Sequence, residues 1–246
     1  MAFPLTHLLV ADEILARYHF IDESQFTMAD ARFAPVYYGR ECSPQEADAA
    51  LVLLGSIAPD GVHYREGFTG ESMSNIGHAK KITHLCPVSD EKWGAVTDND
   101  GWISIVKAFA KNHKDPLSEG YAIHVLTDIY NNMTLWDNFR TRHPKEAAKG
   151  YKSGYYQDLK EIDLWLYQTK VKNGRIKPLL AKAVAKDIPE LVTANEITAI
   201  QNSILCKSYE DPTPGYKYMY ISYDETLQFI QDTADFIMQT IKGGTQ

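Results

Sequence analysis

The sequence has little cysteine: its 246 residues include only Cys42, Cys86 and Cys206, which lie far apart along the chain. An odd number of cysteines without a CxxC pair excludes a zinc ribbon and a disulfide framework as the basis of the fold. Scattered thiols are typical of proteins in a reducing compartment. We therefore expect a cytoplasmic protein.

Long apolar runs are also missing. The first twenty residues contain an apolar stretch, but Asp12 and Glu13 interrupt it, and neither a basic segment nor a small-residue cleavage site accompanies it. This pattern predicts no signal peptide. No run reaches the ~20 apolar residues that a transmembrane helix needs, so we expect no membrane span.

Positive charge is the minority charge in this chain. The 25 Lys and Arg residues stand against 32 Asp and Glu, which gives a net charge of −7. This balance argues against a dedicated nucleic-acid-binding surface. A small-molecule or lipid-like phosphate ester is still compatible with an acidic chain, because a bound metal ion inverts the local charge. The sequence does not indicate an oligomeric state.

Alternating strand patterns are almost absent, and apolar residues recur at helical spacing along most of the chain. We predict an all-α, multi-helix fold in a single domain that spans residues 1–246. Ser222 and Glu225 predict a capping box at the start of the last helix. The predicted helices cover about 5–18, 43–58, 101–112, 117–139, 153–167, 177–186, 194–206 and 222–241.

Residues from about 61 to 99 are predicted to form a long ordered loop. Glycine recurs through this segment and breaks the helical periodicity. The segment also carries Phe68, Leu85 and Trp93, and apolar side chains of this size favour order. Long irregular segments inside compact domains are usually functional when they are ordered, so we expect the loop to contribute to a site.

His124 and Asp128 have the most informative spacing in the sequence. They lie four residues apart on a predicted helix that is otherwise apolar, so their side chains share one face. An imidazole nitrogen and a carboxylate oxygen on one face are suited to a divalent metal ion. Taken alone, the pair is explained equally well by a buried hydrogen bond between the two side chains.

Three further polar residues are predicted to point inward. His7 lies on the apolar face of the first helix, Asp60 follows the end of the second, and His84 lies in the predicted loop. Buried polar groups are normally paired or coordinated, so one shared metal ion explains these positions together. His63, three residues after Asp60, is an alternative or additional ligand.

Four motifs follow one another across roughly the first 140 residues: THLLVADEIL, LLGSIAPD, THLCPV and GYAIHVLTDIYNN. In this combination and order, the chain resembles the zinc-dependent phospholipase C family, which is related to the S1/P1-type nucleases. The resemblance implies a helical fold whose zinc ions hydrolyse phosphate esters. It also implies that Asp60, His84, His124 and Asp128 surround one zinc ion, and that Asp128 bridges to a second ion bound by His7.

The sequence departs from the family pattern in two places. Family members bind metal through the amino group of a processed N-terminal residue, whereas His7 here lies close to an unprocessed start. The third zinc ion of the family needs a histidine soon after the HxxxD motif and then an HxxxE pair. No such histidine follows Asp128, and His143 and Glu146 have the wrong spacing. We therefore expect one or two divalent ions, with zinc as the first choice.

The predicted reaction is hydrolysis of a phosphodiester or phosphomonoester by metal-activated water. Asp60 and Asp128 are the predicted catalytic residues, and Asp60 serves either as a metal ligand or as a base. Arg65, Lys80 and Lys81 lie in the ligand-bearing segment, where they can meet a substrate phosphate.

Asn131 is a further predicted substrate contact. Together with Thr127 and Asn132, it is also a candidate to orient the imidazoles, because all three lie close to His124 along the helix.

Two alternatives use the same residues. In the first, a metal-dependent hydrolase cleaves a different kind of bond. In the second, the chain is not an enzyme, and the cluster binds a structural metal ion that holds helices together. A closed four-ligand site favours the structural role, whereas an open coordination position favours hydrolysis.

Overall fold

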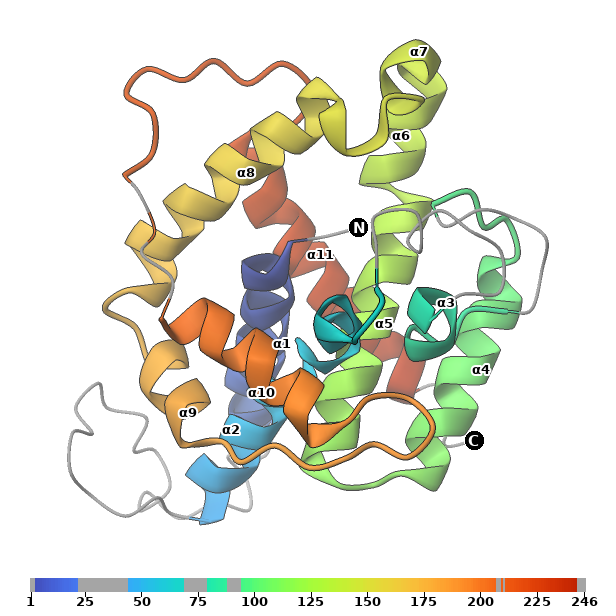
Figure 1. The fold of residues 1–246 in the computed structure, drawn as a ribbon, viewed down its shortest axis with the longest axis vertical. Coiled ribbons are helices and arrows are strands. Elements are labelled where there is room, and N and C mark those ends of the chain that lie inside the picture. The colour runs from blue at the N-terminus through green and yellow to red at the C-terminus, as the bar shows by residue number, and fades with distance from the viewer. Residues whose placement is uncertain are drawn as a thin grey trace.

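Helix α5, Pro116–Met133, is buried along most of its length and runs through the middle of the molecule (Figure 1). Its start is fixed locally, because Pro116 suits a first helical turn and the Asp115 side chain accepts a hydrogen bond from the Ser118 N–H at 3.1 Å. The computed structural model describes residues 3–21, 44–68, 79–87, 94–206, 209 and 211–242, and the fold is given for these.

The described residues form eleven α-helices, with no β-strand among them, around one continuous apolar core. The prediction of an all-α single domain is confirmed. Besides α5, the helices are α1 (Pro4–Ile21), α2 (Pro44–Gly55), α3 (Ala79–Thr83), α4 (Asn99–Asn112), α6 (Leu135–Arg142), α7 (Pro144–Ala147), α8 (Gly154–Leu166), α9 (Ile176–Lys182), α10 (Ala194–Leu205) and α11 (Tyr223–Lys242). Two 3-10 helices, η1 (Ala58–Tyr64) and η3 (Gly150–Lys152), and one π-helix, η4 (Tyr167–Val171), complete the regular structure.

Among the described helices, none is both long enough and apolar enough to cross a membrane.

Helices α2 and α5 cross at very close range. A Cβ atom added at Gly55 would lie 2.0 Å from the Leu117 carbonyl oxygen, and one added at Gly120 would lie 2.0 Å from the Val52 carbonyl oxygen. Only glycine fits at both positions, because any side chain would overlap the backbone of the other helix. This crossing brings the end of α2 and the start of η1 directly against α5.

The prediction of one unbroken helix over residues 117–139 is wrong. The helix stops at Met133, and Thr134 adopts a non-helical conformation with φ −123° and ψ −94° before α6 begins. Tertiary contacts explain the change of direction, because the Trp136 indole donates a hydrogen bond to the Gly94 carbonyl at 2.6 Å and Arg140 donates to the same oxygen. Sequence periodicity does not register such long-range contacts.

The segment predicted as a loop contains two short helices. The predicted second helix ends early, at Gly55, and the chain continues into η1, which includes Asp60. Helix α3 is held in place from outside: the Tyr121 hydroxyl donates to the Thr83 carbonyl, and the Trp102 indole donates to the His84 carbonyl at 2.8 Å.

A capping box was predicted at the start of the last helix. The box at α11 is confirmed, since the Ser222 N–H donates to Glu225 Oε2 at 2.8 Å and the Glu225 N–H donates to Ser222 Oγ at 3.2 Å. Ser43, the first residue of the predicted second helix, lies outside the described residues, as does His78.

Candidate metal centre

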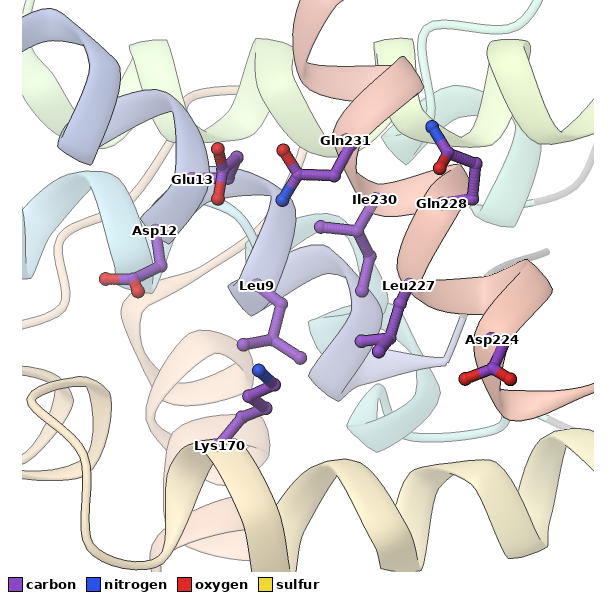
Figure 2. Close-up of a pocket in the computed structure, with 9 residues that line it drawn as sticks. All are labelled: Leu9, Asp12, Glu13, Lys170, Asp224, Leu227, Gln228, Ile230 and Gln231. Carbon is purple, nitrogen blue, oxygen red and sulfur yellow. The ribbon is translucent and has the colours of Figure 1, made fainter.

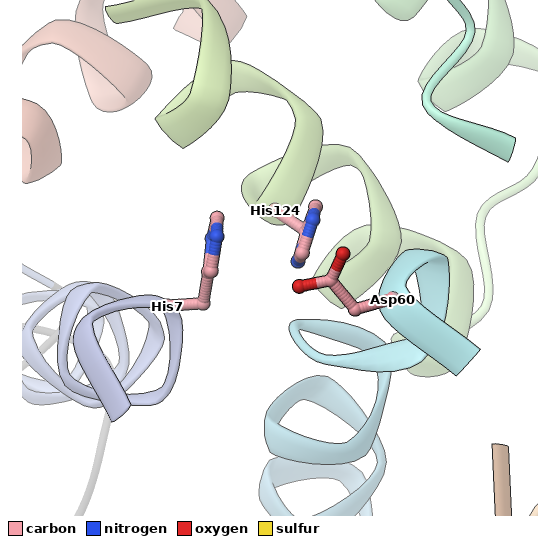
Figure 3. Close-up of side chains that lie close together, drawn as sticks. All are labelled: His7, Asp60 and His124. Carbon is pink, nitrogen blue, oxygen red and sulfur yellow. The ribbon is translucent and has the colours of Figure 1, made fainter. Parts of the chain in front are cut away.

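Five side chains from four segments meet in the interior of the molecule. His7 comes from α1, Asp60 from η1, His84 directly follows α3, and His124 and Asp128 come from α5. The three imidazoles are fully buried, and Asp60 and Asp128 are 6% and 4% exposed. Figure 3 shows three of these side chains, His7, Asp60 and His124, pointing toward one another from separate helices. The structure thus brings together all five residues that the sequence nominated as ligands.

The distances within this cluster suit metal coordination. His84 Nε2 lies 3.4 Å from Asp60 Oδ1 and 3.6 Å from Asp128 Oδ2. His124 Nε2 lies 3.2 Å from His84 Nε2 and 3.9 Å from Asp128 Oδ2, and His7 Nε2 lies 3.5 Å from Asp128 Oδ1. With bonds of ~2.0–2.2 Å, two ligands of a tetrahedral zinc ion are roughly 3.3–3.6 Å apart. The donor atoms are therefore spaced as the ligands of a shared ion would be.

A backbone carbonyl fixes the proton of His124. His124 Nδ1 lies 2.8 Å from the Ser56 carbonyl oxygen, directly after α2. Because a carbonyl oxygen can only accept, Nδ1 carries the proton, and in the neutral ring Nε2 presents a lone pair to the cluster. The close crossing of α2 and α5 positions this carbonyl.

A threonine hydroxyl likewise places the proton of His84 on Nδ1. Thr83 Oγ1 donates to the Lys80 carbonyl at 3.1 Å, so toward His84 Nδ1, 3.0 Å away, it acts as an acceptor. His84 Nε2 then carries a lone pair, which faces the lone pair of His124 Nε2; the two nitrogens are 3.2 Å apart. Two lone pairs at this distance repel each other unless a cation lies between them.

Burial keeps the His7 and His84 imidazoles neutral. Burial lowers the pKa of His84 to about 3, with the Lys80 charge acting in the same direction. Burial, with His124 next in importance, also holds the pKa of His7 well below its usual value. Neutral imidazoles are the form that binds metal.

The carboxyl of Asp60 stays ionised in spite of its burial. Burial opposes the charged form, but the Lys80 ammonium holds the pKa of Asp60 well below its usual range. The cluster therefore contains a buried carboxylate at neutral pH, which is a strong ligand for a divalent ion.

His7 is the most conspicuous member of the cluster in energetic terms. Neither of its ring nitrogens forms a hydrogen bond with any residue that the structure describes, although the ring is fully buried. The ring stacks on His124 with a centroid distance of 3.7 Å. A buried polar group left unsatisfied costs about 1–3 kcal/mol, so this position favours a ligand that satisfies it.

Sequence analysis assigned Lys80 only to a possible phosphate contact and missed its place in the cluster. Lys80 is 1% exposed, and its Nζ lies 2.6 Å from Asp60 Oδ1 and 3.0 Å from His63 Nε2. The one available signal was the spacing to His84, because residues four apart share a helix face. His63, with a side chain 33% exposed, lies at the edge of the cluster, and its Nε2 is 3.7 Å from Asp60 Oδ1.

The other two predicted phosphate contacts occupy different surroundings. Arg65 forms an ion pair with Glu196 and donates to the Leu191 carbonyl at 2.7 Å, which ties η1 to α10. Lys81 is 5% exposed on α3.

The polar residues near His124 on α5 have partners of their own. Thr127 donates to the Ile123 carbonyl at 2.8 Å, and Asn132 donates to the Val96 carbonyl at 2.8 Å. Asn131 is buried beside them. The hydrogen bonds described for the cluster imidazoles therefore come from Ser56 and Thr83, which sequence analysis did not single out.

Aromatic side chains neighbour the cluster. Tyr151 and Tyr156 form a pair with a centroid distance of 4.7 Å, and Tyr151 is 42% exposed. Burial first, then Tyr156 and the charges of Asp60 and Asp128, raise the pKa of Tyr151. Burial, followed by the charge of Asp128, raises the pKa of Tyr156. The tyrosine pair thus lies within electrostatic range of both carboxylates.

A separate surface pocket of about 400 Å³ lies where α1, α11 and η4 meet (Figure 2). Two of its acidic groups are already neutralised, because Asp12 pairs with Arg175 at 2.6 Å and Glu13 with Arg17 at 2.8 Å. No member of the metal cluster is among the described residues that line it, and the candidate site is therefore the buried cluster. The lining residues are Leu9, Asp12, Glu13, Lys170, Asp224, Leu227, Gln228, Ile230 and Gln231.

The described residues thus contain buried His/Asp groups that can hold a metal ion. The resemblance to the zinc-dependent phospholipase C family is still a prediction from four short motifs. Comparison of the chain with protein-family models, curated proteins and solved structures finds no match.

Proposed function

We propose that this chain is a metal-dependent hydrolase that cleaves a phosphate ester, with His7, Asp60, His84, His124 and Asp128 as its metal-binding residues. One observation carries the proposal: the Nε2 lone pairs of His84 and His124 face each other at 3.2 Å beside two carboxylates. Hydrogen bonds on the far side of each ring hold the lone pairs in this direction. A site that needed no cation would place a proton between the two nitrogens.

Different residues of the cluster would have different roles in such a reaction. When bound, a divalent ion polarises a phosphoryl oxygen and lowers the pKa of water. Asp60 and Asp128 supply negative charge, and the three imidazoles supply neutral nitrogen ligands.

His63 lies on the more exposed side of Asp60, where a substrate can approach. Burial lowers the pKa of His63 to about 4, so the ring is neutral at neutral pH.

The substrate class rests on charge and surroundings. A divalent ion would give this buried site a positive potential, although the chain as a whole is acidic, and would attract a phosphate group. The neighbouring Tyr151–Tyr156 pair offers an apolar surface for the rest of the molecule. Both features favour a phosphate ester with an apolar or aromatic substituent.

The metal content of the purified protein tests the first half of the proposal. Elemental mass spectrometry measures the metal content of purified protein that has never been exposed to a chelator. The proteins compared are the wild type, His124→Ala, Asp128→Ala and the exposed control His143→Ala. We expect bound zinc or a similar ion in the wild type and the control, with a loss of at least tenfold in occupancy for the two cluster variants. Folded wild-type protein that binds no divalent ion, even after reconstitution, would contradict the proposal.

Hydrolysis assays test the second half. The metal-loaded wild type is incubated with bis(p-nitrophenyl) phosphate and p-nitrophenyl phosphate, and release of nitrophenolate is measured beside Asp128→Ala. We expect turnover that Asp128→Ala abolishes. A tightly bound ion without hydrolysis of either ester would favour the structural metal ion instead.

A further inference from the structure

Lys80 is a buried cation within the candidate metal centre. Its side chain is 1% exposed, and its Nζ lies 2.6 Å from Asp60 Oδ1 and 3.0 Å from His63 Nε2. An ammonium group has donors only, so His63 must offer its Nε2 lone pair to Lys80. Lys80 therefore uses the two kinds of donor atom, a carboxylate oxygen and an imidazole nitrogen, that a metal ion would use.

The two atoms that Lys80 contacts are spaced like metal ligands. Asp60 Oδ1 and His63 Nε2 are 3.7 Å apart, close to the roughly 3.3–3.6 Å between two ligands of a tetrahedral zinc ion. Asp60 Oδ1 is also 3.4 Å from His84 Nε2. The Lys80 ammonium thus lies against Asp60 and His63. His84, His124 and Asp128 form one group of donor atoms that could hold an ion, and Asp60 also belongs to a second such group, with His7 and His124.

The position of Lys80 is fixed by its helix. Two side chains from α4 and α5 hold the end of α3: Tyr121 donates to the Thr83 carbonyl, and Trp102 donates to the His84 carbonyl. The Lys80 carbonyl itself accepts from Thr83 Oγ1. A lysine on a short helix clamped in this way cannot leave the cluster without breaking several buried contacts.

The charge of the cluster limits how many metal ions it can hold. The two carboxylates and one ammonium of the cluster together carry one net negative charge. One divalent ion changes this to one net positive charge, and a second would raise it to three in a buried site. Uncompensated buried charge is strongly unfavourable.

From this geometry we propose that the Lys80 ammonium is the second cation of the site, in the place of a second metal ion. The wild-type chain then binds one divalent ion within the five-residue cluster, on the side of His84, His124 and Asp128. Asp60 and His63 are held by Lys80 on the side from which a phosphate group would approach. This inference rests on the metal-binding half of the proposed function and selects one of the two stoichiometries expected from the sequence.

Zinc stoichiometry tests the inference. Metal-free full-length protein is titrated with zinc by calorimetry, and the bound ion is then counted by elemental analysis, for the wild type, Lys80→Met and Lys80→Met combined with His63→Ala. Methionine is unbranched like lysine and one atom shorter, so it fills most of the buried space and removes the charge. We expect one equivalent for the wild type, two for Lys80→Met, and a return to one for the double variant.

The outcomes separate the inference from the proposed function. No zinc in the folded wild type would overturn both. Two equivalents in the wild type, or one equivalent in both the wild type and Lys80→Met, would overturn the role of Lys80 alone. If Lys80→Met does not fold, His63→Ala decides, since His63 is at the surface. The His63→Ala variant should still bind one equivalent of zinc, with an affinity within about threefold of the wild type. A tenfold loss of zinc affinity would show that His63 is a metal ligand and that Lys80 is not the cation there.

Discussion

Proton placement on two histidines distinguishes this cluster from an ordinary buried hydrogen-bond network. The Ser56 carbonyl accepts a hydrogen bond from His124 Nδ1–H, and the Thr83 hydroxyl accepts one from His84 Nδ1–H. Both Nε2 atoms are therefore unprotonated in the metal-free protein and present lone pairs to the cluster. Such outer contacts usually contribute 10–100-fold to metal affinity.

Replacing the Thr83 hydroxyl should weaken metal binding without unfolding the protein. In Thr83→Val, His84 Nδ1 loses its acceptor, so the ring is free to place its proton on Nε2. We expect zinc affinity to fall about 10–100-fold, measured by competition with a chromophoric chelator.

Thr127→Val is the matched control. Thr127 is as completely buried as Thr83, and its hydroxyl also donates to a carbonyl of its own helix, that of Ile123. Equal losses of zinc affinity in the two variants would show that Thr83 does not act through His84.

The lowered pKa of His84 predicts that the metal-free protein loses stability in mild acid. The folded-state pKa is about 3, whereas the unfolded value is 6.5. Below pH 6.5 the unfolded chain binds the proton and the folded chain does not, so the free energy of unfolding falls as the pH falls. The loss from His84 is on the order of 2 kcal/mol at pH 5.

Urea unfolding at pH 7 and pH 5 in the presence of chelator measures this loss. The Asp60 carboxyl, with a lowered pKa, adds stability that is lost only below its unfolded value of 3.8, so it does not contribute between these pH values. His84→Gln should show a smaller difference between the two pH values than the wild type, and the exposed control His143→Gln should not. Identical pH dependence in all three proteins would contradict the assignment.

The sequence reveals the clustered His and Asp side chains but not the residues that support them. His7, His124 and Asp128 stand out because they interrupt apolar helix faces, a local pattern. Lys80 does not stand out, since a Lys-Lys pair in a glycine-rich segment ordinarily faces solvent. Its burial depends on how α3 docks against η1, which no local spacing encodes.

At the scale of the elements, the crossing of α2 and α5 builds the site. The absence of a side chain at Gly55 and Gly120 lets the two backbones touch, and this places the Ser56 carbonyl against His124. A change at the crossing should therefore alter both the stability and the metal affinity.

Gly120→Ala tests this link. The new methyl group would lie 2.0 Å from the Val52 carbonyl oxygen, so α2 must move away. We expect the free energy of unfolding to fall by about 1–3 kcal/mol or more, together with a loss of zinc affinity. Ala108→Ser, which adds one atom at an exposed position of α4, should change neither quantity. Urea unfolding and zinc titration of both variants are the measurements, and a stable Gly120→Ala with unchanged affinity would refute the link.

The elements that could be predicted are those with local signals. Helix α11 was predicted from its capping box, and α5 from its apolar periodicity and position in the chain. The break at Thr134 and the short helices η1 and α3 could not be predicted, because distant side chains such as Trp136 and Trp102 impose them.

At the scale of the whole molecule, a metal ion that binds only the folded chain must stabilise it. At a free zinc concentration one hundred times the dissociation constant, the gain is about 2.7 kcal/mol. For a chain of this size, that gain corresponds to a rise of roughly 5–11 °C in the unfolding temperature, measurable by scanning calorimetry with and without chelator. Asp128→Ala should show no rise, and a wild-type unfolding temperature that does not respond to zinc would argue against the site.

The wide separation of the ligands along the chain also determines when the site can exist during folding. His7 and Asp128 are about 120 residues apart, and they meet only where α1 is packed against α5. Closing so large a loop is a late event, because its entropic cost must be met before the contacts form. We therefore expect a metal ion to bind after the rate-limiting step of folding. It would then lengthen the lifetime of the folded chain by slowing its unfolding, and it would leave the rate of folding unchanged.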